Sequence, residues 1–306
     1  MWQNLSNFKV IFLGILIDAL PFILVSVLVS SILHNFISEK IIQESLPTKK
    51  SYNILLACCL GVIFPACDCG MVPIVRRLVQ KGVPLYSAIA FLLSAPIINP
   101  VVAFSTFYAF NSLEIAFFRL FIAFFVASGT SLFIDRLFKQ VPLSSINPAV
   151  SHGCECHSHS HDHNYEKAWK EKLLSVADDA CSEFFEMGKF LILGSAIGAA
   201  VQTFLPREFL LAIGHSPLLS VMVMILFAFT ISVCSSADAF IASSFISSFS
   251  TQSLLAFMVF GPMIDIKNLF MLLHTFPLRF VITLITIVVL LCLLGSYIYP
   301  IATFEF

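Results

Sequence analysis

Two cysteines flank an aspartate within a long apolar stretch of the chain, Phe64-Pro65-Ala66-Cys67-Asp68-Cys69-Gly70-Met71-Val72-Pro73. Thiolates are soft ligands for thiophilic metals and metalloids, and the carboxylate of Asp68 adds a harder ligand. The prolines and Gly70 predict unwound backbone, which at membrane depth is tolerated only beside protein or a watery cavity. We therefore expect a path for a small solute, lined by Cys67, Asp68, Cys69 and Gly70. The alternative is a kinked helix with inert, buried cysteines.

Three other apolar runs are interrupted by polar residues or proline in the same way. One interruption lies at 94–100, and the other two lie at 232–238 and 261–265 in the second half of the chain. Interrupted helices at corresponding positions of two halves are the best sequence indication of a transporter's binding site. We expect the breaks to converge on one path, unless they only kink helices for packing. Their candidate path residues are Ser94, Pro96, Asn99, Cys234, Ser235, Ser236, Asp238, Pro262 and Asp265.

Aspartates lie within or beside these apolar segments, at Asp18, Asp68, Asp238 and Asp265. An ionisable side chain inside a membrane span is costly and is usually functional. We expect these acids to be the candidates for carrying a coupling proton. The alternative is that they pair with Lys267 or Lys189 and have no role in transport.

A polar stretch in the middle of the chain is rich in histidine and cysteine. Its imidazole and thiol groups suit zinc or another transition metal, such as copper or nickel. The spacing matches no fixed zinc-finger pattern, so we expect a flexible binder of low specificity that buffers or senses metal. A solvated linker that binds metal only incidentally is the alternative, and no other cofactor is indicated. The candidate ligands are His152, Cys154, Cys156, His157, His159, His161 and His163.

The composition indicates that these groups belong to a membrane protein. Of the 306 residues, 58% are hydrophobic and 11% are charged, and the mean hydropathy is +0.95. Soluble domains carry about 25% charged residues. Apolar runs of roughly 20 residues recur along the chain and predict an all-α polytopic membrane protein of about eight transmembrane helices. A net charge of −1 and the lack of a nucleotide-binding motif give no indication of nucleic acid or of a nucleotide-driven motor.

The chain divides into two similar halves around the polar stretch. Residues 1–138 form a first transmembrane half, 139–185 a His/Cys-rich loop with an interfacial helix near its end, and 186–306 a second transmembrane half. The broken segments align between the halves, as at 96–99 and 262–265. About four spans in each half would give both halves the same orientation, a parallel rather than an inverted repeat. Chance similarity between hydrophobic segments is the alternative.

The distribution of Lys and Arg predicts the orientation in the membrane. With the N-terminus inside, the cytoplasmic side carries Arg76, Arg77 and Lys81. Arg119 and Lys267 then count as residues of the outer side. The bias favours both termini in the cytoplasm, with the protein in a bacterial inner membrane. The His/Cys-rich loop would then be cytoplasmic as well.

Several motifs are similar to those of one bacterial permease family. They are Pro65-Ala66-Cys67-Asp68-Cys69-Gly70, Val72-Pro73, Gly82-Val83-Pro84 and Ser94-Ala95-Pro96-Ile97-Ile98-Asn99-Pro100. The chain resembles the predicted permeases that include organoarsenical efflux permeases of the ArsP type and permease subunits of two-component membrane complexes. The resemblance implies a permease of about eight spans, with Cys67 and Cys69 in the substrate path and a second membrane or lipoprotein subunit as partner. Asp68 stands where this family often has serine, which favours a metal cation over a neutral organoarsenical.

The sequence thus predicts a permease rather than an enzyme. It would export a small thiophilic solute, such as a metal ion, a trivalent metalloid or an organoarsenical. Two alternatives stay open: a membrane thiol oxidoreductase that uses Cys67 and Cys69, and a metal-sensing membrane subunit of a two-component complex. Cysteines separated by one residue would close a small, strained ring, which counts against the oxidoreductase. The expected partners are the lipid bilayer, the substrate and a second subunit.

Overall fold

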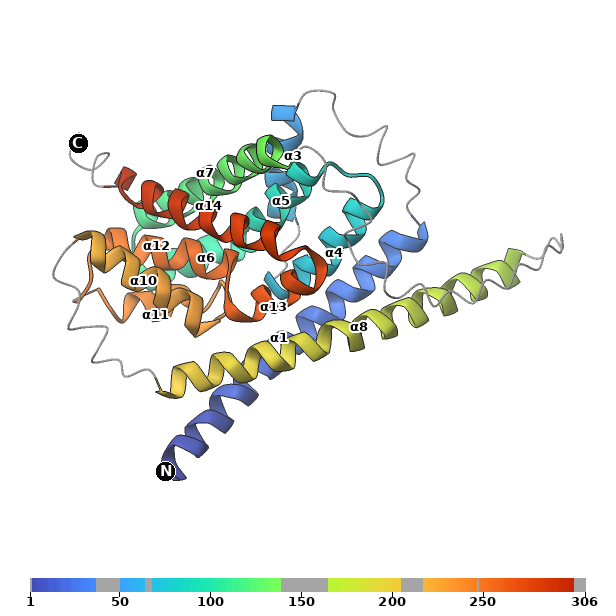
Figure 1. Ribbon diagram of the computed structural model, residues 1–306, viewed down its shortest axis with the longest axis horizontal. Helices are drawn as coiled ribbons and strands as arrows, with labels where there is room; N and C mark the ends of the chain where they lie inside the picture. The colour runs from blue at the N-terminus through green and yellow to red at the C-terminus, as the bar shows by residue number, and fades with distance from the viewer. Residues whose placement is uncertain are drawn as a thin grey trace.

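The computed structural model describes residues 2–36, 50–63, 68–138, 165–204, 217–246 and 248–299. All regular elements in these ranges are helices, and no strand occurs among them. The prediction of an all-α protein is therefore confirmed for the part of the chain that the structure describes. The helices pack into one bundle, with α1 (Trp2–Phe36) and α8 (Tyr165–Phe204) lying side by side along one flank (Figure 1).

The other helices follow one order twice. In each half of the chain, two pairs of short helices are followed by one longer helix. After α1 come the pairs α3–α4 and α5–α6 and then α7. After α8 come the pairs α10–α11 and α12–α13 and then α14. Their bounds are α3 (Lys50–Ile63), α4 (Asp68–Gln80), α5 (Leu85–Ser94), α6 (Pro100–Phe110), α7 (Leu113–Leu137), α10 (Pro217–Ile231), α11 (Asp238–Ser243), α12 (Thr251–Met263), α13 (Ile266–Thr275) and α14 (Leu278–Ser296).

Within the described ranges, 5 segments are long and apolar enough to cross a membrane, which makes the chain a multi-pass membrane protein. The α12–α13 segment is the most enclosed, with 83% of its apolar window buried, against 22% for the span in α1. Shorter apolar helices such as α5 and α6 do not reach a spanning length singly, so the count of about eight spans stays a prediction. The five segments are Ser6–Ile32, Leu113–Leu137, Ser175–Thr203, Thr251–Thr275 and Leu278–Ser296.

The breaks within the helical pairs have local causes. Asn99, between α5 and α6, is extended, and its side chain accepts a hydrogen bond of 2.9 Å from the backbone N–H of Val102. Pro100 follows at the first helical position, where its missing N–H removes no helical hydrogen bond. Asp265, between α12 and α13, is also extended and accepts a bond of 2.7 Å from the backbone N–H of Asn268. Each of these caps starts a new helix directly after a break.

The α3–α4 pair returns to the end of the bundle at which it starts. Asn53, near the start of α3, donates a hydrogen bond to the hydroxyl of Tyr86, which lies just after the α4–α5 turn. Lys50 forms an ion pair of 2.8 Å with Asp135 at the end of α7. Ser131 of α7 donates to the carbonyl of Tyr86. The start of α3, the α4–α5 turn and the end of α7 therefore lie together.

Corresponding long helices of the two halves run in opposite directions. Phe138 at the end of α7 contacts Phe280 at the start of α14, and Phe118 near the start of α7 contacts Tyr299 beyond the end of α14. The ribbons of α1 and α8 are antiparallel as well (Figure 1). The expected parallel orientation does not fit these helices. The physical reason is that α3–α4 returns to its own end of the bundle instead of crossing it.

Helix α8 is one continuous helix of 40 residues. It contains Trp169–Phe185, for which the sequence predicts an interfacial helix, and it continues without a break to Phe204 in the expected second transmembrane half. It therefore runs across the boundary at 185/186 between the expected loop and the second half. At about 1.5 Å per residue it is roughly 60 Å long, about twice the thickness of a bilayer core. Its first turns extend beyond the bundle (Figure 1).

Gly194 of α8 packs against the backbone of Lys267 in α13. A Cβ atom at Gly194 would lie 2.8 Å from the Lys267 Cα, whereas a Cβ at Gly188 would meet nothing within 4 Å. We expect Gly194→Ala to lower the thermal unfolding midpoint in detergent, because overpacking costs about 1–3 kcal/mol. Gly188→Ala, the matched control in the same helix, should leave the midpoint unchanged or raise it, since alanine favours helix. Equal midpoints for the two variants would contradict the close approach of α8 to α13.

Candidate functional site

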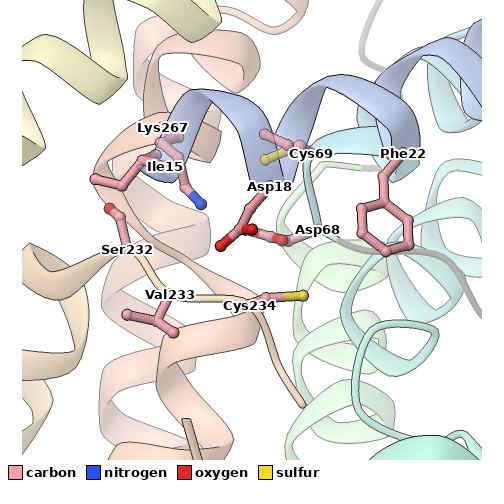
Figure 2. A pocket seen from close by; sticks show the side chains of 10 residues that line it. Ile15, Asp18, Phe22, Asp68, Cys69, Ser232, Val233, Cys234 and Lys267 are labelled. Atoms are coloured by element: carbon pink, nitrogen blue, oxygen red, sulfur yellow. The ribbon is translucent and has the colours of Figure 1, made fainter. Parts of the chain in front are cut away.

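Four segments of the chain enclose a cavity of about 60 Å³ (Figure 2). Its walls come from α1, from the start of α4, from the break between α10 and α11, and from the start of α13. This volume suits a few water molecules or one small solute. The polar groups of the lining belong to Asp18, Asp68, Cys69, Ser232, Cys234 and Lys267.

The first turn of α4 places a carboxylate and a thiol at the cavity. Asp68 and Cys69 are its first two residues, and both are buried. The positive end of the helix dipole stabilises a carboxylate at this position. Gly70 allows α4 to approach α1 closely, because a Cβ atom there would collide with the side chain of Ser26. This close approach lets Asp18 of α1 share the same cavity.

Asp18 brings a second carboxylate to the cavity. It is exposed, although it lies in the middle of the apolar span Ser6–Ile32. Figure 2 shows the carboxylates of Asp18 and Asp68 pointing into the cavity toward one another. A carboxylate at membrane depth requires water or a counter-charge. Asp68 and the nearby Lys267 lie in the same cavity as this carboxylate.

Lys267 is the single basic residue among the described residues that line the cavity. Its side chain is buried, and its Nζ lies 3.4 Å from Oδ2 of the buried Asp265. The other carboxylate oxygen of Asp265 caps α13 by accepting from the backbone of Asn268. In Figure 2 the ammonium group points into the cavity, toward Asp18. Asp265 therefore both starts α13 and holds the ammonium group beside the cavity.

The break between α10 and α11 adds a hydroxyl and a thiol. Ser232 has a left-handed backbone with a φ of 47°, which is uncommon for a residue with a side chain. Its hydroxyl is buried and has no hydrogen-bond partner among the described residues. The Cys234 sulfur lies 3.9 Å from the hydroxyl of Ser236. A strained backbone thus presents polar groups to the cavity, as is common at functional sites.

A buried ion pair holds this break in place. Arg119 of α7 is fully buried, and it donates to both carboxylate oxygens of Asp238 at 2.9 and 2.8 Å. The same guanidinium donates to the carbonyls of Ser235 and Met258 and to the hydroxyl of Thr106. One side chain therefore ties α6, α7, α11 and α12 to the backbone of the break.

A second charged cluster joins the far ends of α4 and α13 to α8. Glu186 of α8 contacts both Arg76 of α4 and His274 of α13. Glu183, one turn earlier in α8, pairs with Arg77 at 3.6 Å. Helices α4 and α13 thus begin at the cavity and end at this cluster. A shift of either helix along its axis would displace groups at both places.

The structure brings only some of the expected path residues into one cavity. Asp18, Asp68, Cys69 and Cys234 line it, and Asp265 contacts its lysine. Cys67 and the expected metal ligands at 152–163 lie outside the described residues. The expected residues that do not line this cavity are Gly70, Ser94, Pro96, Asn99, Ser235, Ser236, Asp238 and Pro262.

Three important residues are missing from the expected path: Arg119, Ser232 and Lys267. The two basic residues carried a usable signal, because each lies within or beside an apolar segment, where a charge is costly. The orientation prediction counted both as residues of the outer side, so their positions within or beside apolar segments were not used to place them in the path. Ser232 opens the interruption at 232–238 that the sequence indicated, but a serine beside a helix break is ordinary and does not by itself indicate a path residue.

The cavity offers thiols, carboxylates, a hydroxyl and an ammonium group, but no ready coordination sphere. Among the residues that the structure describes, no group of three or more His, Cys, Asp or Glu side chains could hold a metal ion. Thiol and carboxylate groups can still bind a soft cation or a metalloid transiently. A solute in passage must be bound weakly enough to leave again.

Arg119→Ala should destabilise the protein by roughly 3–5 kcal/mol, because it leaves the carboxylate of Asp238 buried without its partner. Adding Asp238→Asn should recover part of the loss by removing that charge. Arg136→Ala is the matched control, since Arg136 lies exposed in the same helix, and it should have no measurable effect. Thermal unfolding in detergent compares the variants. A wild-type midpoint for Arg119→Ala would show that the ion pair does not hold the break.

Comparison with known proteins agrees with a multi-pass carrier. A family described as predicted permease, ArsP_1, matches residues 4–301. The chain is 45% identical over 287 residues to UPF0718 protein YcgR of Bacillus subtilis, with 94% of each chain covered. It is 40% identical over 290 residues to the "Putative two-component membrane permease complex subunit" of Streptococcus mutans serotype c, with 93% of each covered. No solved structure matches. The chain belongs to the ArsP_1 family of predicted permeases.

Proposed function

We propose that this chain is a permease that exports a small thiophilic solute, a metal ion or a trivalent metalloid, through the cavity between α1, α4 and α13. The observation that carries the proposal is the convergence of Asp68, Cys69, Asp18 and Cys234 on one cavity, although they come from three separate segments. Soft sulfur and hard oxygen ligands side by side suit a thiophilic cation or metalloid. Export is the direction that the resemblance to efflux permeases favours.

The acids of the cavity are our candidates for proton coupling. Asp18 and Asp68 face the cavity, and Asp265 is occupied by the cap of α13 and by Lys267. Asp238 is engaged by Arg119, so it is a weaker candidate. A proton that binds Asp18 or Asp68 would weaken the hold on a cation. Proton entry and cation release would thereby be linked.

The two halves of the chain, in our proposal, are related as an inverted repeat. Three observations support it: both halves follow the same order of helices, Asn99 and Asp265 form matching caps, and α1 and α8 run antiparallel. Helices α3–α4 would enter and leave the membrane at one end. Helix α11 turns back beside α10, where Phe245 contacts Phe227, so this pair would do the same from the other end. Inverted halves of this kind support alternating access around a central site.

Basic residues of the described helices gather at one end of the bundle, and this supports an orientation with that end in the cytoplasm. The expectation of cytoplasmic termini counted Arg119 and Lys267 as outer-side residues, but Arg119 pairs with Asp238 inside the bundle and Lys267 lines the cavity. The start of α1, which carries Lys9, lies toward the opposite end (Figure 1). We therefore propose that both termini lie outside the cytoplasm of a bacterial cell and that the His/Cys-rich stretch lies inside. The basic residues of the cytoplasmic end are Lys50, Arg76, Arg77, Lys81, Arg136, Lys167, Lys170, Lys172 and Arg279.

A second subunit is part of the proposal. The relative from Streptococcus mutans is named as a subunit of a two-component membrane permease complex. We propose that this chain also works with a second membrane or lipoprotein subunit. The His/Cys-rich stretch at 152–163 would bind zinc or another transition metal on the cytoplasmic side, before the metal reaches the cavity.

Transport by the purified chain in proteoliposomes tests the proposed path. We expect Asp68→Asn and Cys69→Ser each to lower the transport of Cd²⁺ or arsenite by about tenfold or more, because each removes a ligand of the cavity. Cys292→Ser is the matched control: this thiol is buried in α14 and does not line the cavity, so transport should persist. Wild-type rates for both cavity variants would refute the path, and a loss in the Cys292→Ser control would point to a general thiol effect.

Reporter fusions test the orientation. Alkaline phosphatase fused after residue 306 should be active, because this enzyme matures only outside the cytoplasm, and a fluorescent protein at the same place should stay dark when exported unfolded. Insertion of the same reporters near residue 150 should give the reverse pattern. If the fluorescent fusion after residue 306 is bright and the phosphatase fusion is inactive, the C-terminus lies in the cytoplasm. That result would contradict the orientation inferred from the basic residues.

A further inference from the structure

We propose that Lys267 is a tethered counter-ion: its ammonium group balances the acids of the empty cavity and gives way to a cation when one binds. The inference rests on the proposed function, and it adds that the solute is a cation and that the empty carrier is neutralised from within. A neutral metalloid would not need to displace an ammonium group.

Lys267 stands in an unfavourable place for a positive charge. It is the second residue of α13, where the helix dipole repels a cation, and its side chain is only 6% exposed. A buried lysine at membrane depth is costly unless acids compensate it. Asp18, Asp68 and Asp265 supply those acids from three different elements. The charge of Lys267 is therefore stable only as the partner of this acidic cavity.

The ammonium group lies among several acids at the cavity, whereas the backbone of Lys267 is fixed against a neighbouring helix. Its ion pair with Asp265 is 3.4 Å long. Strong charge-assisted bonds of this type measure about 2.7–2.9 Å. The Cα of Lys267 is pressed against Gly194 of α8, where a Cβ would approach to 2.8 Å. The side chain can therefore swing aside while its anchor point stays in place.

The carboxylates of the cavity outnumber its ammonium group. Lys267 can balance one of them, and Arg119 cannot help because Asp238 and neighbouring carbonyls occupy it. A cation that enters would complete the charge balance, whereas an anion would meet net repulsion. The excess of acids thus selects a positively charged solute.

Ser232 offers the incoming cation a ligand that the empty cavity does not use. Its side chain is 2% exposed and lines the cavity, and its hydroxyl oxygen has no hydrogen-bond partner in the described ranges. An unsatisfied buried hydroxyl is costly. The hydroxyl points toward Gly198 of α8 in the empty cavity, and in our proposal it turns inward to a cation bound at Asp68 and Cys69. In that state the ammonium group of Lys267 would remain with Asp265 alone.

Through this exchange of partners, Lys267 would act in the step in which the empty permease reorients after releasing its cation. When the cation leaves, the ammonium group turns back to the acids, and the cavity can reorient without an uncompensated charge. Without Lys267 the cation would be bound more tightly, and the empty cavity would be hard to reorient. Net transport and exchange of bound for free cation would then respond differently to its loss.

Equilibrium binding of Cd²⁺ to the purified full chain tests the counter-ion directly. We expect Lys267→Gln to bind Cd²⁺ roughly tenfold or more tightly than the wild type, because one nearby positive charge is removed. Lys267→Arg keeps the charge and should keep the wild-type affinity. Lys189→Gln is the matched control: this lysine is exposed on α8 and does not line the cavity, so its loss should change nothing. Unchanged or weaker binding by Lys267→Gln, or no Cd²⁺ binding by any variant, would overturn the proposal.

Flux in proteoliposomes separates this inference from the proposed function. Lys267→Gln should keep Cd²⁺–Cd²⁺ exchange and lose net Cd²⁺ efflux by about tenfold or more. An equal loss of both fluxes in a folded variant would overturn the counter-ion and leave the permease standing. Tighter binding by Lys267→Gln without transport by the wild type would support the counter-ion and overturn the proposed permease. If Lys267→Gln does not fold, Lys267→Met removes the same charge with a similar shape.

Discussion

Lipid offers no hydrogen bonds to the backbone, so every break in a membrane helix must be satisfied by the protein itself. Side chains next to the breaks meet this demand here. Asn99 accepts from the first turn of α6, Asp265 accepts from the first turn of α13, and Arg119 donates to the carbonyl of Ser235. Each of these three residues is buried. The breaks are thereby kept inside the bundle, and the polar groups that they carry are kept there with them.

The cavity follows from this constraint. Once the start of α4, the start of α13 and the break after α10 are enclosed, their polar residues have no solvent to face except a shared space. The cavity also receives Asp18, because Gly70 lets α4 lie close to α1. In our proposal, the thiols and acids of this small cavity bind the solute transiently during transport. Both the proposed path and the proposed counter-ion depend on this enclosure.

The two buried basic residues illustrate different uses of charge. Arg119 makes bonds to Asp238, to two carbonyls and to a hydroxyl, with distances between 2.7 and 3.1 Å, and so fixes four helices. Lys267 forms an ion pair of 3.4 Å with Asp265 and lines the cavity. A guanidinium with several planar donors is suited to the first task, and a flexible ammonium group to the second. The short bonds of Arg119 fix the positions of the helices. The longer ion pair of Lys267 suits the proposed exchange of the ammonium group for a bound cation.

Composition and local chemistry determined the membrane class, the family motifs and the places of several breaks. Asn99 and Asp265 could be predicted as break residues because a cap acts on N–H groups only three residues away. The sequence predicted that breaks converge, but not that Asp18 and Lys267 join Cys69 at one cavity, because these residues are far apart in the chain and meet only when α1, α4 and α13 pack together. The return of α3–α4 likewise depends on contacts with α7, such as Lys50 with Asp135. Only the tertiary structure decided which breaks meet and in which direction the halves run, because packing, rather than local sequence, selects among distant partners.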